Sequence, residues 1–315
     1  MPLLLLKTIS LNSPSMSHTS FNPRELNLGK LHACLLGGVA PRPIAFASTV
    51  DSKGRVNLAP FSYFNVFSAN PPVLIFSPAR RGRDNTTKHT YENVIEVPEV
   101  VVNMVDYNTV HACSLASTEY EKGVNEFEKT GLTEVASDVI KPPRVLEAPV
   151  SFECKVLRLD SFGDNPGAGQ LVVCEIVKMH FRNDILNHDG VPDPQKIDLV
   201  GRCGGNFYVR ASGDALFEVP KPLANLGIGV DSIPDDIRLS SVLTGRHLAI
   251  LGNIEVLPDE TDVNDYKLME LSEIFLELQD DGLALELELH KHAVNLLDNG
   301  DVDGAWKTLL SFNLG

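Results

Sequence analysis

The most constraining feature of the sequence is a series of short β-prone segments between Arg42 and Asp106, each ended by turn residues. Ser52, Lys53 and Gly54, for example, supply a hairpin turn between two of these segments. Alternation of short strands and turns is typical of an antiparallel barrel. The sequence therefore predicts a mainly β fold with α additions. The expected strands in this part are residues 43–51, 56–64, 72–77 and 100–105.

One helix is expected among these strands. Residues 86–95 carry apolar side chains on one side only, and Asn85 is available as the helix cap. The pattern continues past residue 106 with further elements. These are a helical, charged stretch at 107–131, long strands at 150–159 and 171–181 joined by a loop at 163–169, and a surface excursion at 183–205.

The character of the chain changes after residue 213, where a Pro-rich linker leads to acidic amphipathic helices. Apolar residues recur there at helical spacing: Leu268, Leu271, Ile274, Phe275 and Leu278, followed by residues 283–297 and 302–310. We interpret these stripes as packing faces, with a lid or a partner-docking role as the alternative. The expected division is a flexible N-terminal extension at 1–24, a barrel domain at 25–213, and a linker with a C-terminal helical extension at 214–315.

The formal net charge of -15 argues against binding to nucleic acid, because the field repels phosphates and no cluster of basic and aromatic residues offsets it. The same field opposes any phosphate ligand. A phosphate site in this chain must therefore gather its own cations and amide donors.

Cysteine usage suits a reducing compartment. The five cysteines are widely separated and contain no C-x-x-C pair. The apolar run from Leu3 to Leu6 is too short to span a membrane and follows no basic residues. We therefore expect a cytoplasmic protein with no membrane partner.

Two clusters in the predicted barrel carry distinctive chemistry. Small residues between Asn57 and Ser62 would let the backbone approach a planar ring, with Pro60 expected to fix a local turn. The second cluster contains Arg80, Arg81, Arg83, Lys88, His89 and Thr90. Cations and a hydroxyl beside a helix start suit a phosphate, and the two clusters together match the needs of a flavin. A solvated basic loop is the alternative for the second cluster.

Ordered motifs from residue 28 to 212 make the sequence similar to a known family. They are Pro41-Arg42-Pro43-Ile44-Ala45 with Ser48-Thr49, Asn57-Leu58-Ala59-Pro60-Phe61-Ser62-Tyr63-Phe64-Asn65, Asn70-Pro71-Pro72, Lys88-x-Thr90-x-x-Asn93, Val102-Asn103, Glu153-Cys154, Val177 to His180, and Arg202-Cys203-Gly204-Gly205 before Tyr208. With these motifs the chain resembles the flavin reductase-like family of FMN-binding split barrels, to which flavoredoxin belongs. The resemblance implies a split β-barrel of Greek-key type.

The resemblance also implies a homodimer that binds FMN non-covalently near the subunit interface. NADH or NADPH would be the transient reductant, and a small molecule or a protein the electron acceptor; FAD in place of FMN stays open. The residues implied for the flavin pocket are Arg42, Ser48, Thr49, Asn57, Leu58, Ala59, Ser62, Asn65, Arg202 and Tyr208, with Arg83, Lys88 and Thr90 at the phosphate.

The implied chemistry is centred on the flavin, because hydride transfer needs stacked rings more than a protein acid or base. Backbone amides between Leu58 and Ser62 are expected to stabilise the reduced ring. His180 is a candidate for a role on the substrate side. Two positions depart from the family pattern, which commonly has an acidic residue at His89 and a glycine at Cys174.

Two other function classes stay open: an electron carrier or sensor whose acidic C-terminal helices dock a protein, and a structural interaction protein. Three further classes lack their motifs. The sequence has no complete G-x-G-x-x-G for a Rossmann domain, no G-x-S-x-G for a hydrolase, and no metal-ligand spacing around His180, His188 and Asp189.

Overall fold

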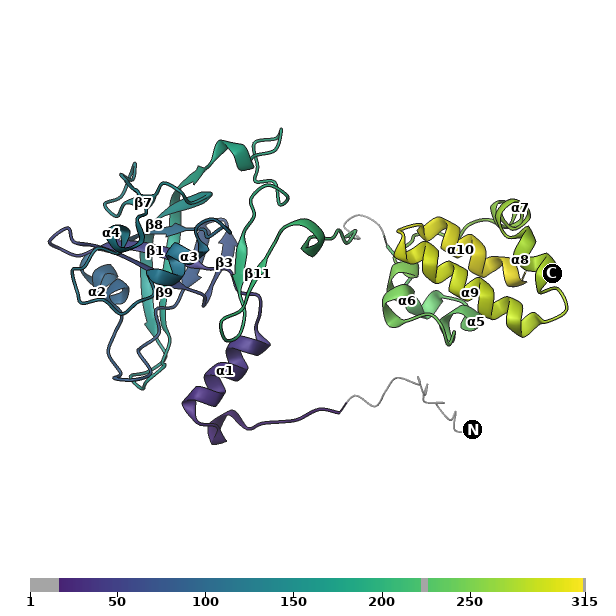
Figure 1. Ribbon diagram of the computed structural model, residues 1–315, viewed down its shortest axis with the longest axis horizontal. Helices are drawn as coiled ribbons and strands as arrows, with labels where there is room; N and C mark the ends of the chain where they lie inside the picture. Colours follow the sequence, from purple (N-terminus) through teal and green to yellow (C-terminus); the bar gives the residue numbers. More distant parts are fainter. Residues whose placement is uncertain (1–16, 222–225, 314–315) are drawn as a thin grey trace. The chain divides into compact units, whose positions relative to one another are not determined.

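A computed structural model describes residues 17–221 and 226–313. The chain divides into two compact units, Met1–Phe217 and Glu218–Gly315 (Figure 1). Most of the extension expected at 1–24 lies outside the described residues; the described part ends in a short 3-10 helix at Pro23–Glu25. No helix in the described ranges is both long and apolar enough to cross a membrane.

The first unit is built on one seven-stranded antiparallel sheet with the order β2-β1-β5-β8-β9-β4-β3. The expected strand at 56–64 is wrong as a single element, because the chain breaks pairing at Ser62 and starts a new strand at Phe64. The strands are β1 (Ala45–Val50), β2 (Val56–Phe61), β3 (Phe64–Ala69), β4 (Pro72–Phe76), β5 (Glu99–Asn103), β8 (Val150–Ser161) and β9 (Gln170–Phe181). Two small hairpin sheets pair β6 (Glu134–Val135) with β7 (Arg144–Val145), and β10 (Val200–Arg202) with β11 (Tyr208–Arg210).

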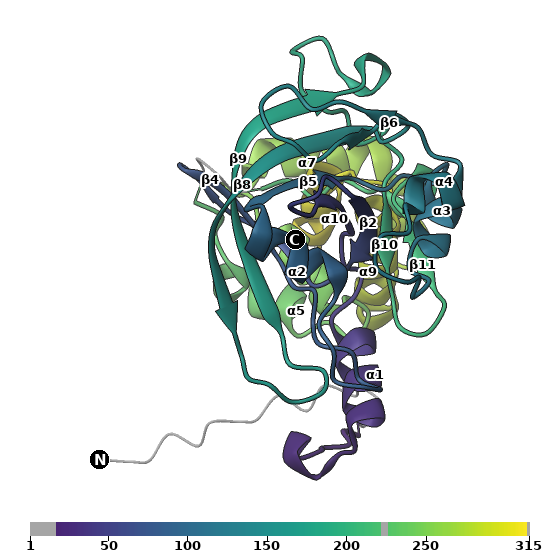
Figure 2. The ribbon, with the colours of Figure 1, turned by 90° about the vertical axis from the view of Figure 1, so that its left-hand side faces the viewer.

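The link between β2 and β3 forces this sheet to curl. The two strands lie at opposite edges, yet only Ser62 and Tyr63 separate them along the chain. In a flat sheet of this order the outer strands would lie roughly 29 Å apart, whereas this link spans at most about 10 Å. The sheet must therefore roll up until its edges meet. Figure 2 shows the resulting curvature in β8 and β9, and the strand order leaves the barrel split between β2 and β3.

Strand β1 separates two apolar cores, as the two-residue periodicity of a strand requires. Ala45 and Ala47 face the core inside the curled sheet, which also receives Val94 from α2 (His89–Glu96). Ile44 and Phe46 face the other core, which is covered by α3 (Val110–Leu115) and α4 (Glu126–Thr130). Every residue of β1 is therefore buried.

Helix α2 begins later than the expected start at residue 86. The predicted cap Asn85 is wrong: it adopts a positive φ of 58° and its side chain bonds Arg80 and the Asp164 carbonyl instead. Lys88 is the N-cap and makes no side-chain capping bond. A further helix, α1 (Leu28–Gly38), precedes the barrel and was not expected from the sequence.

The second unit is helical and has its own core around Trp306. The Trp306 indole N–H donates to the Leu251 carbonyl at 3.1 Å, and α9 and α10 pack side by side (Figure 1). The expected stripe from Leu268 to Leu278 is wrong as one helix, because it is divided at Leu271 and leaves Leu268 exposed. The helices are α5 (Asp235–Arg238), α6 (Gly245–Leu251), α7 (Glu260–Glu270), α8 (Ser272–Glu277), α9 (Gly282–Asp298) and α10 (Val302–Leu310).

Candidate functional site

A cavity of 510 Å³ lies where β2 leads into β3, and we call it the seam cavity. The link residues Ser62 and Tyr63 contribute to its wall, as do His32 and Leu36 of α1. The rest of the wall comes from β2, the loop at 77–83, the start of α2, the segment at 116–120 and Glu126. The curling of the sheet therefore brings distant parts of the chain to one cavity.

Strand β2 and the start of α2 meet at this cavity through side-chain hydrogen bonds. The Asn57 amide donates to the buried hydroxyl of Thr90 at 2.9 Å, and the Asn93 amide donates to the Thr49 hydroxyl at 3.1 Å. The two sequence clusters thus converge in space. The segment at 57–61 is a strand, however, so the expected turn at Pro60 is wrong: Pro60 pairs with Phe46 of β1.

Three cations on the cavity wall surround one carboxylate. Arg81, Arg83 and Lys88, which we call the cation cluster, all contact Glu119, at 3.2, 2.5 and 3.3 Å respectively. His89 lies beside them; burial and then the charge of Arg81 lower its pKa, so its ring is uncharged at neutral pH. Arg80 contributes to the same wall and is held by Asn85.

The outer edge of β2 has little free hydrogen-bonding capacity. The Leu58 amide donates to the Glu126 carboxylate at 2.8 Å, and Pro60, two residues further along the same edge, has no amide proton. Burial raises the pKa of Glu126, against the effect of the Leu58 bond. The expectation that the backbone amide of Leu58 is available to a ligand is therefore wrong, and Pro60, as expected from its residue type, offers no donor.

Several predicted pocket residues lie behind the cavity wall. Ser48, Thr49 and Leu58 are buried, and the Ser48 hydroxyl has no hydrogen-bond partner within the described residues. Arg42 is also buried, where it donates to the carbonyls of Leu36 and Val39 and to the Ser62 hydroxyl. Asn65 is exposed on β3, and its side chain accepts from the Val66 amide. Of the predicted residues, the cavity wall holds Asn57, Ala59, Ser62, Arg83, Lys88 and Thr90.

Arg202 and Tyr208 line a smaller cavity of 170 Å³, which we call the side recess. It shares Pro60, Phe61 and Ser62 with the seam cavity, so the two adjoin across the end of β2. The Arg202 guanidinium stacks on the Tyr208 ring at 4.7 Å. It has no acidic partner among the side chains that the structure describes.

Comparison with known proteins identifies this arrangement. The model of the flavin reductase like domain matches residues 37–193. An uncharacterized protein of Aquifex aeolicus is 38% identical over 199 residues, which are 63% of this chain and 99% of the relative. The chain belongs to the flavin reductase-like family.

Solved structures agree with this assignment. Nitrilotriacetate monooxygenase component B from Bacillus cereus is 31% identical, with a TM-score of 0.60 over 66% of this chain and 100% of that one. A protein described as a candidate flavin reductase with a split barrel domain, from Shewanella frigidimarina, is 25% identical, with a TM-score of 0.55 over 65% and 99% of the two chains. The predicted split-barrel fold is confirmed.

Membership of the flavin reductase-like family indicates a flavin-related oxidoreductase, and the residues at the seam cavity fit a phosphorylated flavin. A volume of 510 Å³ is within the range of about 300–1,000 Å³ usual for small-molecule sites. The cation cluster matches the charge of a phosphate. Small side chains, such as Ala59 and Ser62, leave room for a planar ring beside β2.

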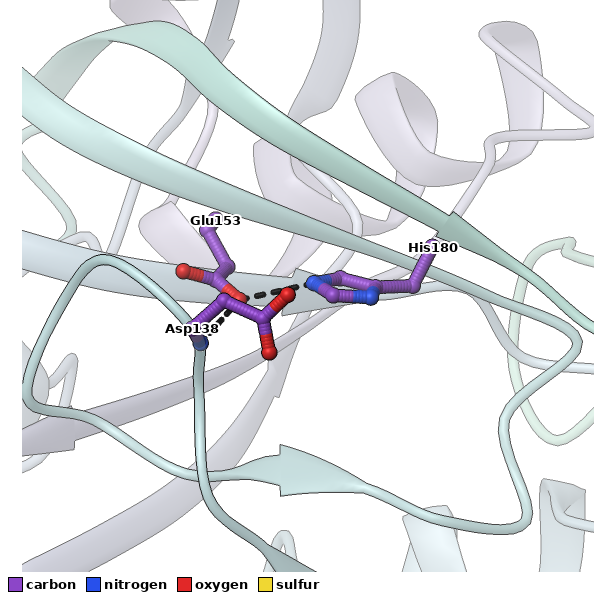
Figure 3. Close-up of side chains that lie close together, drawn as sticks. All are labelled: Asp138, Glu153 and His180. Atoms are coloured by element: carbon purple, nitrogen blue, oxygen red, sulfur yellow. Dashed lines mark hydrogen bonds and ion pairs between the residues drawn. The ribbon is translucent and has the colours of Figure 1, made fainter.

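His180 does not line the seam cavity or the side recess; it belongs to a separate polar cluster (Figure 3). Its Nε2 lies 2.7 Å from Oε1 of the fully buried Glu153, which also accepts from the backbone amides of Asp138 and Val139. Oxygen and nitrogen atoms of Asp138, Glu153 and His180 lie within 4.8 Å of one another. Both Glu153 oxygens already accept hydrogen bonds, and Lys178 pairs with Asp138, so the groups form a hydrogen-bonded network between β8 and β9.

Sequence reasoning missed Glu119 and Glu126, the two acidic groups of the seam cavity. A phosphate is bound by cations and hydroxyls, so acidic residues in the sequence carry no signal for such a site. Glu126 follows Asn125, a helix N-cap, and this could have placed it at a helix start. No local pattern could have placed Glu119 beside Arg81, which is 38 residues earlier.

The Glu153 network predicts a pH-dependent stability. Burial opposes ionisation of Glu153, but the amides of Asp138 and Val139 and the His180 ring outweigh it and lower the pKa below the ordinary value of 4.5. A lowered carboxyl pKa stabilises the fold above the ordinary pKa, and this stabilisation is lost as the pH falls through the folded-state value. Glu153→Gln should therefore cost about 1–3 kcal/mol at neutral pH, with a difference from the wild type that shrinks below pH 4.5.

Urea unfolding at several pH values measures this effect. Glu128→Gln, a change at an exposed position of α4, is the matched control and should have little effect at any pH. A cost for Glu153→Gln that stays constant down to the acid limit of the fold would contradict the assignment.

Proposed function

We propose that the protein is an NAD(P)H-dependent flavin reductase that holds FMN in the seam cavity. The observation that carries this proposal is the convergence of β2, with its small residues, and the cation cluster on one cavity wall. Bound FMN would supply the redox chemistry, accepting a hydride from reduced nicotinamide and passing electrons to an acceptor.

The side chains of this chain would bind and orient the cofactor. Arg81, Arg83 and Lys88 would hold its phosphate through charge-assisted hydrogen bonds, with the start of α2 adding the positive end of a helix dipole. We propose FMN and not FAD because a terminal phosphate monoester concentrates about 1.5 to 2 negative charges on one group, whereas the diphosphate of FAD spreads its charge over two. The three cations surround a single carboxylate, which suits one such group. The hydrogen bond from Asn57 to Thr90 would fix β2, beside the flavin ring, relative to the start of α2, beside the phosphate.

The side recess, with a volume of only 170 Å³, would receive the reactive ring of the second reactant and not the whole molecule. It adjoins the seam cavity across Pro60, Phe61 and Ser62, and Arg202 and the stacked Tyr208 offer a cation and an aromatic surface. A reduced nicotinamide nucleotide has both a planar ring and negatively charged phosphates, and so does a free flavin phosphate as an acceptor. We infer a cytoplasmic setting from the five free thiols, three of them buried.

We also propose that two copies pair through α1. This eleven-residue helix contains Leu28 and Leu35, both exposed, and buries none of its residues. Helices shorter than about 12–15 residues are marginal in water without a packing surface, so a second copy would stabilise α1. Since His32 and Leu36 line the seam cavity, such a dimer would form beside the flavin site.

Sedimentation velocity tests the dimer. The wild type should sediment as a dimer at micromolar concentration, and Leu35→Glu should shift it toward the monomer, because a charge on the covered face would be desolvated. Leu276→Glu, at an exposed position of α8, is the control and should not change the association state. A wild-type monomer at all concentrations would refute this part of the proposal.

Binding measurements test the phosphate contact. Lys88→Ala should weaken FMN binding by about 1.5–3 kcal/mol, because a charge-assisted bond is lost, and should leave riboflavin binding unchanged. Lys122→Ala is the control, since Lys122 pairs with Glu92 and does not line the cavity. Quenching of flavin fluorescence gives both affinities, and equal losses for FMN and riboflavin would contradict the assignment of Lys88 to the phosphate.

Anaerobic stopped-flow mixing tests the reductase activity. FMN-loaded protein mixed with NADH or NADPH should lose the absorbance of oxidised flavin. The alternative is an electron carrier that docks a protein, and it is favoured by the acidic second unit, which has 19 Asp and Glu against six Lys and Arg. Bleaching by a reduced protein donor, and by neither nicotinamide, would replace the reductase with the carrier.

A further inference from the structure

Glu119 occupies the centre of the cation cluster. Its Oε1 lies 3.2 Å from Arg81 Nε and 3.3 Å from Lys88 Nζ, and its Oε2 lies 2.5 Å from Arg83 Nη2. All four residues line the seam cavity. Both oxygens of one carboxylate are thus bound by the side chains that would bind a phosphate.

A carboxylate and a phosphate compete for such a cluster because they use the same contacts. Each presents oxygen acceptors with delocalised negative charge to guanidinium and ammonium donors. A phosphate monoester carries about 1.5 to 2 negative charges at neutral pH, against one for the carboxylate. A ligand phosphate can therefore displace Glu119, but it must give up part of its binding free energy to do so.

The three cations differ in how firmly other groups hold them. Arg81 also donates to the Thr86 hydroxyl at 2.9 Å and to the Thr87 carbonyl, so it stays in place when Glu119 leaves. Arg83 is exposed, and within the described ranges the side chains of Arg83 and Lys88 make their hydrogen bonds and ion pairs with Glu119 alone. Displacement of Glu119 would thus release two cations to a ligand while the third remains as a fixed anchor.

Other charged groups near the cluster are already engaged. The Asp84 carboxylate accepts from the Thr86 amide and hydroxyl at 3.0 and 2.7 Å, and Glu92 is bound by Lys122 and Thr87. Glu119 is therefore the anion that contacts all three members of the cluster.

We propose that Glu119 is a built-in competitor for the flavin phosphate, which lowers the affinity for FMN and speeds its release. This inference rests on the proposed function, since it assumes that FMN enters the seam cavity. It assigns a specific property to that site: the flavin is held as an exchangeable ligand, and reduced FMN can leave as a product when the carboxylate returns to the cations.

The test compares FMN and riboflavin binding by the full chain and by Glu119→Gln. The amide has no charge to offer the cations, so the variant should bind FMN about 10-fold more tightly, as expected for the loss of several partly exposed ion pairs. Most of the change should appear as slower dissociation of FMN. Riboflavin lacks the phosphate and does not compete with Glu119 for the cations, so its affinity should stay within about 2-fold of the wild-type value.

Two controls separate local competition from other effects. Glu121→Gln makes the same change of net charge on the same segment, at an exposed residue outside the cavity wall, and should leave the FMN affinity nearly unchanged. Inorganic phosphate is a probe without a ring, and it should compete with FMN about 10-fold more strongly in Glu119→Gln than in the wild type. Glu119→Ala should likewise tighten the binding of FMN and of inorganic phosphate, so one poorly folded variant would not decide the outcome.

The outcomes distinguish this inference from the proposed function. Unchanged or weaker FMN binding in both Glu119 variants, with riboflavin binding retained, would overturn the competitor role and leave the reductase proposal intact. Absence of flavin binding in the wild type and in every variant would overturn the proposed function itself.

Discussion

The two-residue link between β2 and β3 is the constraint on which the rest of the first unit depends. Because Ser62 and Tyr63 cannot span a flat seven-stranded sheet, the edges of the sheet must approach each other. The link itself then becomes part of a cavity wall. The barrel is split at the same place where its cavity lies, so the geometry that closes the fold also creates the candidate site.

Hydrogen bonds within the first unit then determine which groups that cavity presents. Asn57 and Asn93 attach α2 to the first two strands, which brings Lys88 to the cavity. Glu126 uses the Leu58 amide, and Pro60 removes a second donor from the same edge. Along this edge of β2, the contacts with a ring would therefore be mainly steric, whereas charge is concentrated in the part of the wall around Glu119.

The sequence predicted the parts of the fold that local patterns control. Turn residues and apolar alternation located β1, β4, β8 and β9, and helical spacing located α9 and α10. The break at Ser62 was missed because residues on both sides of it are equally β-prone. Asn85 was an acceptable cap by residue type, but its bonds to Arg80 and Asp164 depend on a distant loop. Residue chemistry indicated the two clusters that converge, and the family resemblance supported their pairing, whereas the acidic members of the cavity required the folded chain.

The net charge of the chain is distributed unevenly between the two units. Taken over the whole chain, a net charge of -15 gives a field that opposes any phosphate ligand. Residues 1–217 contain 21 Lys and Arg against 23 Asp and Glu, so the barrel unit is close to neutral. The second unit carries most of the excess, with six basic and 19 acidic residues. At about 0.15 M ionic strength a charge is screened within about 8 Å, so the electrostatics of the seam cavity depend mainly on the residues of its own wall. The balance between the cation cluster and Glu119 therefore governs the attraction of a phosphate more than the total charge of the protein does.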